Sequence, residues 1–258
     1  WNYISSIGSY ISVIGLAVFL INLLYAFAKK KKTVANSNHW SFQPVAAEHR
    51  YAGVDAFLNE AMANKKLRPL GRAERRTLIR RVYLVMLGLP PLPEEVAQFL
   101  NDDSPQAWDR LVGRILASPH YGERWGRHWL DVVRYAESTG KEIDVSSPNA
   151  WRYRDYVIDA FNADLPYDRF LTEQIAGDLL EACSAEEGDR YLVATGYLAI
   201  GAKPAKAMND NFEMDVVADQ IAAIGSGVLG ISVGCARCHD HKFDPITQKN
   251  FYELSAFF

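Results

Sequence analysis

Apolar residues recur along most of the chain at the spacing of amphipathic helices. The first such face is formed by Val54, Phe57, Leu58, Ala61 and Met62, which follow the i, i+3, i+4, i+7, i+8 pattern. Comparable faces predict further helices over residues 72–87, 108–116, 125–136, 151–161, 170–180, 191–200 and 212–229. No segment alternates apolar and polar residues as a half-buried strand would. The pattern therefore predicts a mainly α-helical, multi-helix globular domain, with long loops at 140–147 and 202–211.

Three helix starts share one local signal, a serine followed by a proline. They are Ser104-Pro105, Ser118-Pro119 and Ser147-Pro148. A serine hydroxyl can accept from the free amides of the first helical turn, and proline at the first helical position removes no hydrogen bond. We therefore expect a helix to begin directly after each serine.

The start of the chain has a different character. No charged residue occurs from Tyr3 to Ala28, and Lys29 to Lys32 follow directly. A bilayer core needs about 20 residues of apolar helix, so this stretch predicts a transmembrane helix. We therefore expect a membrane anchor with a basic flank at 1–32, a linker and domain entry at 33–52, and the helical domain at 53–258. The chain ends within an apolar run, so we expect the domain to be truncated at its C-terminus.

Charge is unevenly distributed over the 258 residues. The formal net charge is -3, and the four lysines of the basic flank are the only charged residues among the first forty. The remainder is mildly acidic, which argues against nucleic-acid binding and favours a basic docking partner. The chain has three cysteines, a count that excludes a disulfide framework.

The most specific motif is Cys235-Ala236-Arg237-Cys238-His239. This spacing is typical of covalent c-type haem attachment. In that interpretation Cys235 and Cys238 form the thioether bonds, and His239 is the proximal iron ligand. Candidates for the sixth iron ligand are Met208, Met214, His128 and His120. The motif thus predicts a cofactor, haem c, and an electron-transfer role.

A non-haem metal is the alternative interpretation of the same segment. Cys235, Cys238, His241 and Asp244 are suitable zinc ligands within ten residues, and His239 adds another imidazole. A zinc ion there would make the domain a structural module or an envelope hydrolase-like protein. A hydrolase would draw on a second cluster, which comprises His128, Asp131, Arg134 and Glu137. We favour a salt-bridge network for that cluster, and we predict no catalytic residue.

Two segments also resemble known families. Residues 1–12, with 34–36 and Trp40, look like the last transmembrane helix of subunit I of the haem–copper oxidases. The stretch contains none of that subunit's metal ligands, so the resemblance does not imply oxidase chemistry in this chain. It implies only a neighbour, a respiratory oxidase or another redox protein. From His39 onward, ordered blocks resemble the planctomycete cytochrome c-associated domain, a family of unknown function. The blocks are residues 39–45, 80–84, 87–91, 93–96, 118–125, 127–131, 151–155, 174–179 and 233–245.

The predicted location contains a conflict. The lysines at 29–32 place the domain on the cytoplasmic side by the positive-inside rule. The family resemblance implies a secreted or envelope-bound domain, and c-type haem is attached outside the cytoplasm. We predict a membrane-anchored, extracytoplasmic domain, because the family resemblance covers far more of the chain than the anchor does.

Overall fold

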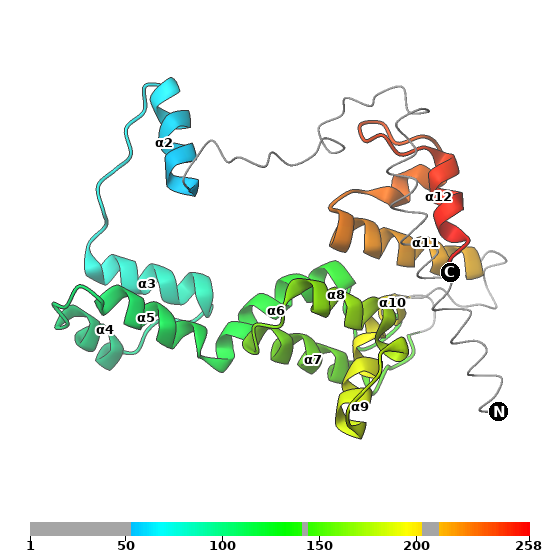
Figure 1. Ribbon diagram of the computed structural model, residues 1–258, viewed down its shortest axis with the longest axis horizontal. Coiled ribbons are helices and arrows are strands. Elements are labelled where there is room, and N and C mark those ends of the chain that lie inside the picture. The colour runs from blue at the N-terminus through cyan, green and yellow to red at the C-terminus, as the bar shows by residue number, and fades with distance from the viewer. Residues whose placement is uncertain (1–52, 141–143, 203–211) are drawn as a thin grey trace.

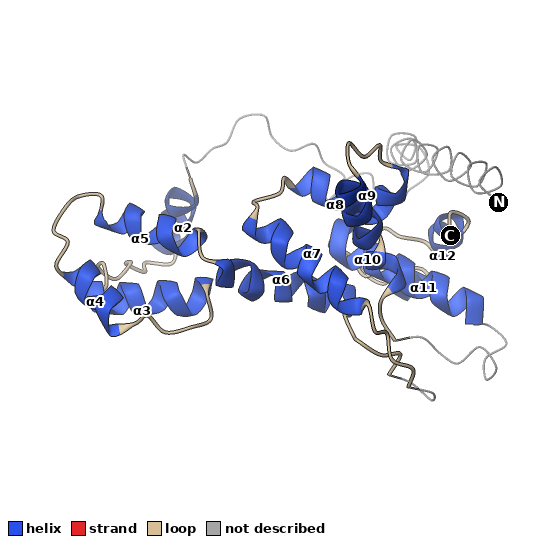
Figure 2. Ribbon diagram, turned by 90° about the horizontal axis from the view of Figure 1, so that it is seen from below, coloured by secondary structure: helices blue, strands red, loops and turns tan. Residues whose placement is uncertain are grey.

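A computed structural model describes residues 53–140, 144–202 and 212–258. This part of the chain is built from helices and contains no β-strand, only an isolated bridge between Ser138 and Ser146. The prediction of a mainly α-helical, multi-helix domain is confirmed, as Figure 2 shows. The helices are α2 (Val54–Asn64), α3 (Arg75–Met86), α4 (Pro93–Leu100), α5 (Ala107–Leu116), α6 (Pro119–Val133), α7 (Ala150–Asn162), α8 (Tyr167–Ala176), η3 (Gly177–Leu179), α9 (Ala185–Ala194), α10 (Gly196–Ala199), α11 (Phe212–Ile224), η5 (Gly225–Leu229), η6 (Val233–Arg237) and α12 (Gln248–Ser255).

The helices form an elongated body with three parts. Figure 1 shows α3 to α5 at one end, α6 to α10 in the middle, and α11, η5, η6 and α12 at the other end. Each part has its own cluster of buried apolar side chains. The helix α2 stands apart from α3 to α5 in Figure 1, and none of its residues is buried. The apolar face predicted for α2 is therefore exposed at Val54, Phe57 and Leu58, although the helix itself is confirmed.

The predicted helix starts agree with the structure to different degrees. Helix α6 begins at Pro119 with Ser118 as its N-cap residue, as expected, but the Ser118 side chain makes no capping hydrogen bond. Helix α5 begins only at Ala107, so the prediction at Ser104 is wrong. The Ser104 hydroxyl accepts from Arg110, and its amide donates to the Asp102 carboxylate at 3.1 Å, which holds this residue in a turn instead. Helix α7 begins only at Ala150, with Asn149 as its N-cap residue, so the prediction at Ser147 is also wrong.

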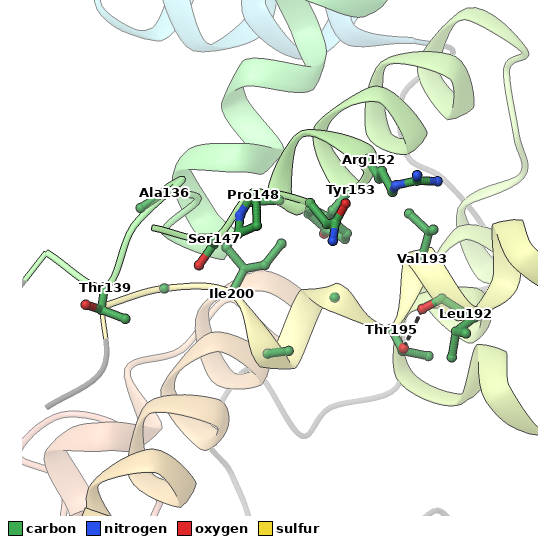
Figure 3. A pocket seen from close by; sticks show the side chains of 15 residues that line it. Ala136, Thr139, Ser147, Pro148, Arg152, Tyr153, Leu192, Val193, Thr195 and Ile200 are labelled. Atoms are coloured by element: carbon green, nitrogen blue, oxygen red, sulfur yellow. Dashed lines mark hydrogen bonds between the residues drawn. The ribbon is translucent and has the colours of Figure 1, made fainter. Parts of the chain in front are cut away.

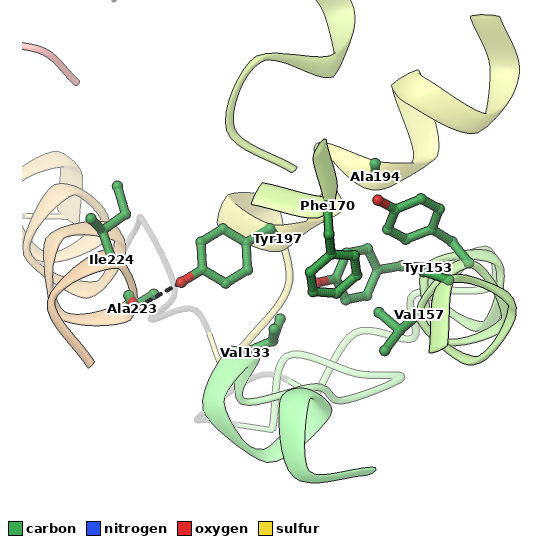
Figure 4. Packing of buried hydrophobic residues seen from close by; sticks show 10 residues of the cluster. Val133, Tyr153, Val157, Phe170, Ala194, Tyr197, Ala223 and Ile224 are labelled. Carbon is green, nitrogen blue, oxygen red and sulfur yellow. Dashed lines mark hydrogen bonds between the residues drawn. The ribbon is translucent and has the colours of Figure 1, made fainter. Parts of the chain in front are cut away.

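Aromatic side chains fill the central core, between α6, α7, α8, α10 and α11. The Trp129 ring stacks on Tyr197 with 5.7 Å between centroids, and it meets Phe170 edge-on at 5.0 Å. The Tyr197 hydroxyl donates to the Ala223 carbonyl at 2.7 Å, which ties this core to α11 (Figure 4). Burial raises the pKa of Tyr197 to about 12, so the hydroxyl stays protonated and keeps donating.

Two buried polar side chains of α8 are fully engaged. The Gln174 carbonyl oxygen accepts from the Trp129 indole at 2.7 Å and also from the Tyr153 hydroxyl. Glu173 has no exposed surface, and its carboxylate accepts from Arg169 at 2.9 Å, Arg190 at 3.0 Å and Tyr156 at 3.1 Å. Because buried polar groups are costly unless they are paired, these contacts fix the mutual positions of α6 to α9.

Among the described residues no helix is both long enough and apolar enough to cross a bilayer. The predicted anchor at 1–32 and the linker at 33–52 lie outside the described residues. The predicted loop at 202–211 is described only at Ala202, and the loop at 140–147 lacks residues 141–143.

Candidate functional site

The Cys-x-x-Cys-His motif lies at the α11–α12 end of the body. Residues 233–237 form the short 3-10 helix η6, and Cys238 follows as its C-cap residue. The side chains of Val233 and Ala236 are buried in a cluster with Ile221 of α11 and Phe251 of α12. This anchoring turns the residues on either side outward, so Cys235 and Cys238 are both exposed free thiols.

The 3-10 conformation explains why the two thiols share one side. A 3-10 helix has three residues per turn, so positions i and i+3 lie directly above each other. Cys235 is in η6 and Cys238 directly follows it with a helical backbone, φ -105° and ψ -26°. The two sulfur atoms are therefore presented to the solvent on one side of the segment, as two bonds to one flat ring require.

The tautomer of His239 follows from its hydrogen bond. Its Nδ1 atom lies 2.8 Å from the Asp240 carbonyl oxygen. A carbonyl oxygen only accepts, so Nδ1 carries the proton and Nε2 presents a lone pair. The imidazole is exposed, and Nε2 makes no hydrogen bond to any residue in the described part of the chain. An Nδ1–H bond to a backbone carbonyl is the usual way in which a metal-binding imidazole is oriented.

Hydrogen bonds from α11 and α12 hold the motif in place. Arg237 pairs with Asp215 of α11, with 2.7 Å between Nη2 and Oδ1. The carbonyl of Arg237 accepts from the Gln248 side chain at 3.0 Å and from the Tyr252 hydroxyl at 3.2 Å, both on α12. The backbone amide of Gln248 donates to the Asp240 carboxylate at 2.8 Å. The motif is thus fixed on both sides by helices whose contacts its spacing alone does not indicate.

His241 closes the loop behind the motif. Its Nδ1 atom accepts from the backbone amide of Asp244 at 2.8 Å, so Nδ1 carries no proton. The proton is therefore on Nε2, which donates to the Ser232 hydroxyl at 3.0 Å. Only 7% of the His241 side chain is exposed. Although the Asp244 carboxylate lies 3.4 Å from Nδ1, this contact is not an ion pair, because the nitrogen is unprotonated.

This geometry bears on the zinc interpretation. Both ring nitrogens of His241 are engaged by Ser232 and Asp244, so neither is free to bind a metal. No group of three or more His, Cys, Asp or Glu residues within 53–140, 144–202 and 212–258 is arranged to hold a metal ion. Ser232, His241 and Asp244 also match the residue types of a hydrolytic triad. The proton on Nε2 faces the serine, however, so the imidazole cannot act there as a general base.

The sixth-ligand candidates lie in different parts of the fold. Met214 is exposed on α11 and immediately precedes Asp215, which pairs with Arg237 of the motif. His120 and His128 are exposed on α6, where His120 contacts Glu123 at 2.7 Å and His128 lies against the Trp125 ring. Met208 lies outside the described residues. The fold therefore ties the turn of Met214 to the motif segment, and it engages both histidines elsewhere.

Residues 53–258 match the profile of PSCyt2, described as a protein of unknown function (DUF1549). The chain belongs to the PSCyt2 family. The match covers all helices of the described part and includes the motif. No curated protein and no solved structure matches the chain.

The PSCyt2 domain has a separate cavity between α7, α9 and α10, with a volume of about 500 Å³ (Figure 3). Tyr153 and Ile200 form part of its wall, and the Thr195 hydroxyl donates to the Leu192 carbonyl at 2.7 Å. No His, Cys, Asp or Glu is among the described residues that line it. The cavity therefore lacks a candidate general base or metal ligand.

The second polar cluster is divided between two structural contacts. Arg134 ends α6 in the left-handed region, with φ 59°, and it donates to Asp219 of α11 at 2.9 Å and to the Ile200 carbonyl at 3.2 Å. Glu137 instead accepts from Tyr135 at 2.8 Å and from Arg154 at 3.2 Å. These residues connect α6 to α7 and α11, and they do not converge with His128 on one acid–base site.

Glycines near the motif serve helix packing. A side chain at Gly225 would lie 2.8 Å from Val233 and 2.9 Å from the Ile231 carbonyl, and one at Gly227 would lie 2.5 Å from the Tyr197 hydroxyl. Contacts this short exclude a Cβ atom without movement of the neighbours. These glycines allow η5 to pack closely on η6 and on the central core.

Proposed function

We propose that the PSCyt2 domain of this chain carries one covalent haem c on Cys235, Cys238 and His239, and that it transfers electrons. The observation that carries the proposal is the state of His239. Its Nδ1–H group is held by the Asp240 carbonyl, which leaves an exposed Nε2 lone pair beside two exposed thiols. When bound, haem c supplies a one-electron redox centre with iron ligation from this imidazole.

The surroundings of the motif support the same proposal. The side chain of Phe243 is strongly exposed four residues after His239, and Tyr252 is half exposed while its hydroxyl bonds the motif carbonyl. Both rings offer apolar surface to a bound macrocycle. Met214 is our candidate for the sixth ligand, because α11 is tied to the motif through Asp215 and Arg237. A thioether ligand would favour electron transfer.

Our proposals for the compartment and for the partner protein rest on the sequence. We infer an anchor at residues 1–32 and a position outside the cytoplasm, where c-type haem is attached. The oxidase resemblance of the first forty residues supports a respiratory oxidase or another redox protein as the partner. The four lysines at 29–32 support the opposite orientation, so a topology reporter fused after Phe258 tests this part directly.

Covalent haem is tested by expressing the full chain in a host with a c-type maturation system. We expect the denatured band to stain for haem and to give a pyridine haemochrome spectrum. The variant C235A/C238A should lose the stain. The matched variant C183A also removes an exposed thiol, but away from the motif, and should keep the stain. A colourless, folded wild-type chain with one bound zinc ion would overturn the proposal.

A further inference from the structure

The strongest charge concentration of the chain lies far from the motif in sequence. The 17 residues from Lys65 to Arg81 contain eight Lys or Arg and one acidic residue, Glu74. Their net charge is +7, whereas the whole chain has a net charge of -3. We call residues 65–85 the basic segment. It comprises the connection between α2 and α3 and nearly all of α3.

Most cations of the basic segment face solvent without a carboxylate partner. Arg75 is used inside the fold, where it donates to the Asp102 carbonyl at 2.7 Å, and the guanidinium of Arg72 lies 5.9 Å from the Trp108 ring centroid. The other six are exposed and form no ion pair with any residue in the described part of the chain. They are Lys65, Lys66, Arg68, Arg76, Arg80 and Arg81.

Exposed aliphatic side chains are interleaved with these cations. On α3, Ile79 and Tyr83 are buried. Leu84 and Val85 are exposed. They lie one turn after Arg80 and Arg81 on the same faces of α3, because residues four apart share a helix face.

Before α3, Leu67 is exposed and Leu70 is 96% exposed. The basic segment therefore presents positive charge and large aliphatic side chains together.

We propose that the basic segment docks on an anionic phospholipid surface. Each Lys or Arg near such a surface is attracted by its negative potential, and aliphatic side chains enter the region between headgroups and acyl chains. A nucleic acid would satisfy the cations but leave the aliphatic side chains in water. The segment also has no exposed aromatic ring for base stacking, because its only aromatic residue, Tyr83, is buried.

The position of the basic segment agrees with this partner. Lys32 ends the basic flank of the predicted anchor, and the basic segment begins 33 residues later. It therefore lies in the first part of the domain after the predicted membrane span. Helix α3 lies at the end of the body opposite α11 and α12 (Figure 1). Docking through the basic segment leaves the cysteine motif open to another protein.

The test uses the full chain reconstituted into lipid nanodiscs, read by hydrogen–deuterium exchange. One set of discs contains phosphatidylcholine alone, and the other also contains phosphatidylglycerol. We expect the non-helical amides of residues 67–74 to exchange at least about tenfold more slowly on the anionic discs, and high salt to remove the difference. The variant R76E/R80E should abolish this protection. The milder R76Q/R80Q, which keeps helix propensity without a charge reversal, should reduce it.

A matched control reverses two exposed arginines outside the basic segment. R127E/R152E changes the net charge by the same amount and should keep the protection. Equal exchange on both kinds of disc, or equal behaviour of the two double variants, overturns the proposal. Heparin, a soluble polyanion, is added to the neutral discs as a further control. If it protects residues 67–74 as strongly as phosphatidylglycerol does, the assignment to lipid is overturned. Haem staining of the same samples is independent, so failure of either proposal is recognised separately.

Discussion

Substituting Gly122 by alanine tests how closely α6 and α7 must pack. A Cβ atom at this position would lie 2.4 Å from the Ile158 carbonyl oxygen and 2.7 Å from the Asn162 side chain. Ordinary contacts to a Cβ atom begin near 3.4 Å, so the helices must separate by about 1 Å to clear the Ile158 carbonyl oxygen, and the Asn162 amide must shift as well. That amide accepts from the Gly122 backbone at 2.8 Å and donates to the Pro119 carbonyl at 3.1 Å.

The magnitude follows from three contributions. Overpacking in a close contact costs typically 1–3 kcal/mol, and we take about 2–3 kcal/mol because backbone is involved. Loss of the two Asn162 hydrogen bonds adds about 1–2 kcal/mol. Alanine gains about 1 kcal/mol over glycine within a helix. We therefore expect the Gly122→Ala change to lower the free energy of unfolding by about 2–4 kcal/mol.

The assay compares two glycine substitutions in neighbouring helices. A Cβ atom at Gly113 of α5 meets nothing within 4 Å, so Gly113→Ala should stabilise the domain by up to about 1 kcal/mol. Urea unfolding of the full chain in mild detergent, followed by tryptophan fluorescence, measures both variants against the parent chain. If Gly122→Ala proves as stable as Gly113→Ala, the close approach of α6 and α7 is refuted.

Two further predictions concern charged groups. Hydrogen bonds from Arg110 and then Ser104 lower the pKa of Asp102 to about 2, so its contribution to stability is present above the unfolded pKa near 3.8 and is lost as the pH falls toward 2. The fall of the urea midpoint over this pH range should be smaller in Asp102→Asn, and an unchanged pH profile would contradict the assignment. Replacing fully buried Glu173 by leucine should lower the free energy of unfolding by about 2–3 kcal/mol. This loss is smaller than for breaking a fully buried ion pair, because the partners Arg169 and Arg190 are 40% and 42% exposed and can regain water. Isosteric Glu173→Gln should cost about 1 kcal/mol and exposed Glu137→Gln less than about 0.5 kcal/mol, both by urea unfolding, and equal losses in all three would refute the role of burial.

Helix periodicity was sufficient to predict the mainly helical class and most of the helices, but not α4 or α12. The apolar faces at 72–87 and 151–161 correspond to α3 and α7, because burial of one face is the main determinant of an amphipathic helix. The serine–proline signal was less reliable. Ser104 shows why, since the Asp102 carboxylate and the Arg110 guanidinium compete for its amide and hydroxyl. Both contacts are local, but a serine–proline pair alone does not reveal that Asp102 and Arg110 engage Ser104.

The motif shows a similar limit at the site. Spacing alone suggested Cys235, Cys238 and His239 as a cofactor site, and the fold presents all three to solvent. Spacing also suggested His241 and Asp244 as zinc ligands. The hydrogen bonds from Ser232 and from the Asp244 amide depend on the path of the backbone after η6, which ligand counting does not reveal. The pairing of Arg237 with Asp215 across 22 residues is equally invisible in the sequence.

The basic segment also clarifies the conflict over compartment. The positive-inside rule counts cations within about 15–20 residues of a membrane span. The cations at 65–81 lie beyond that range from the predicted anchor, so they add nothing to a cytoplasmic assignment. The assignment therefore depends on Lys29 to Lys32 alone. Lipid docking through α3 needs only an anionic leaflet, and it would leave η6 at the opposite end of the body accessible on whichever side the domain is placed. The two proposals, membrane docking through α3 and haem attachment at η6, are thus compatible, and a topology reporter tests on which side of the membrane the domain lies.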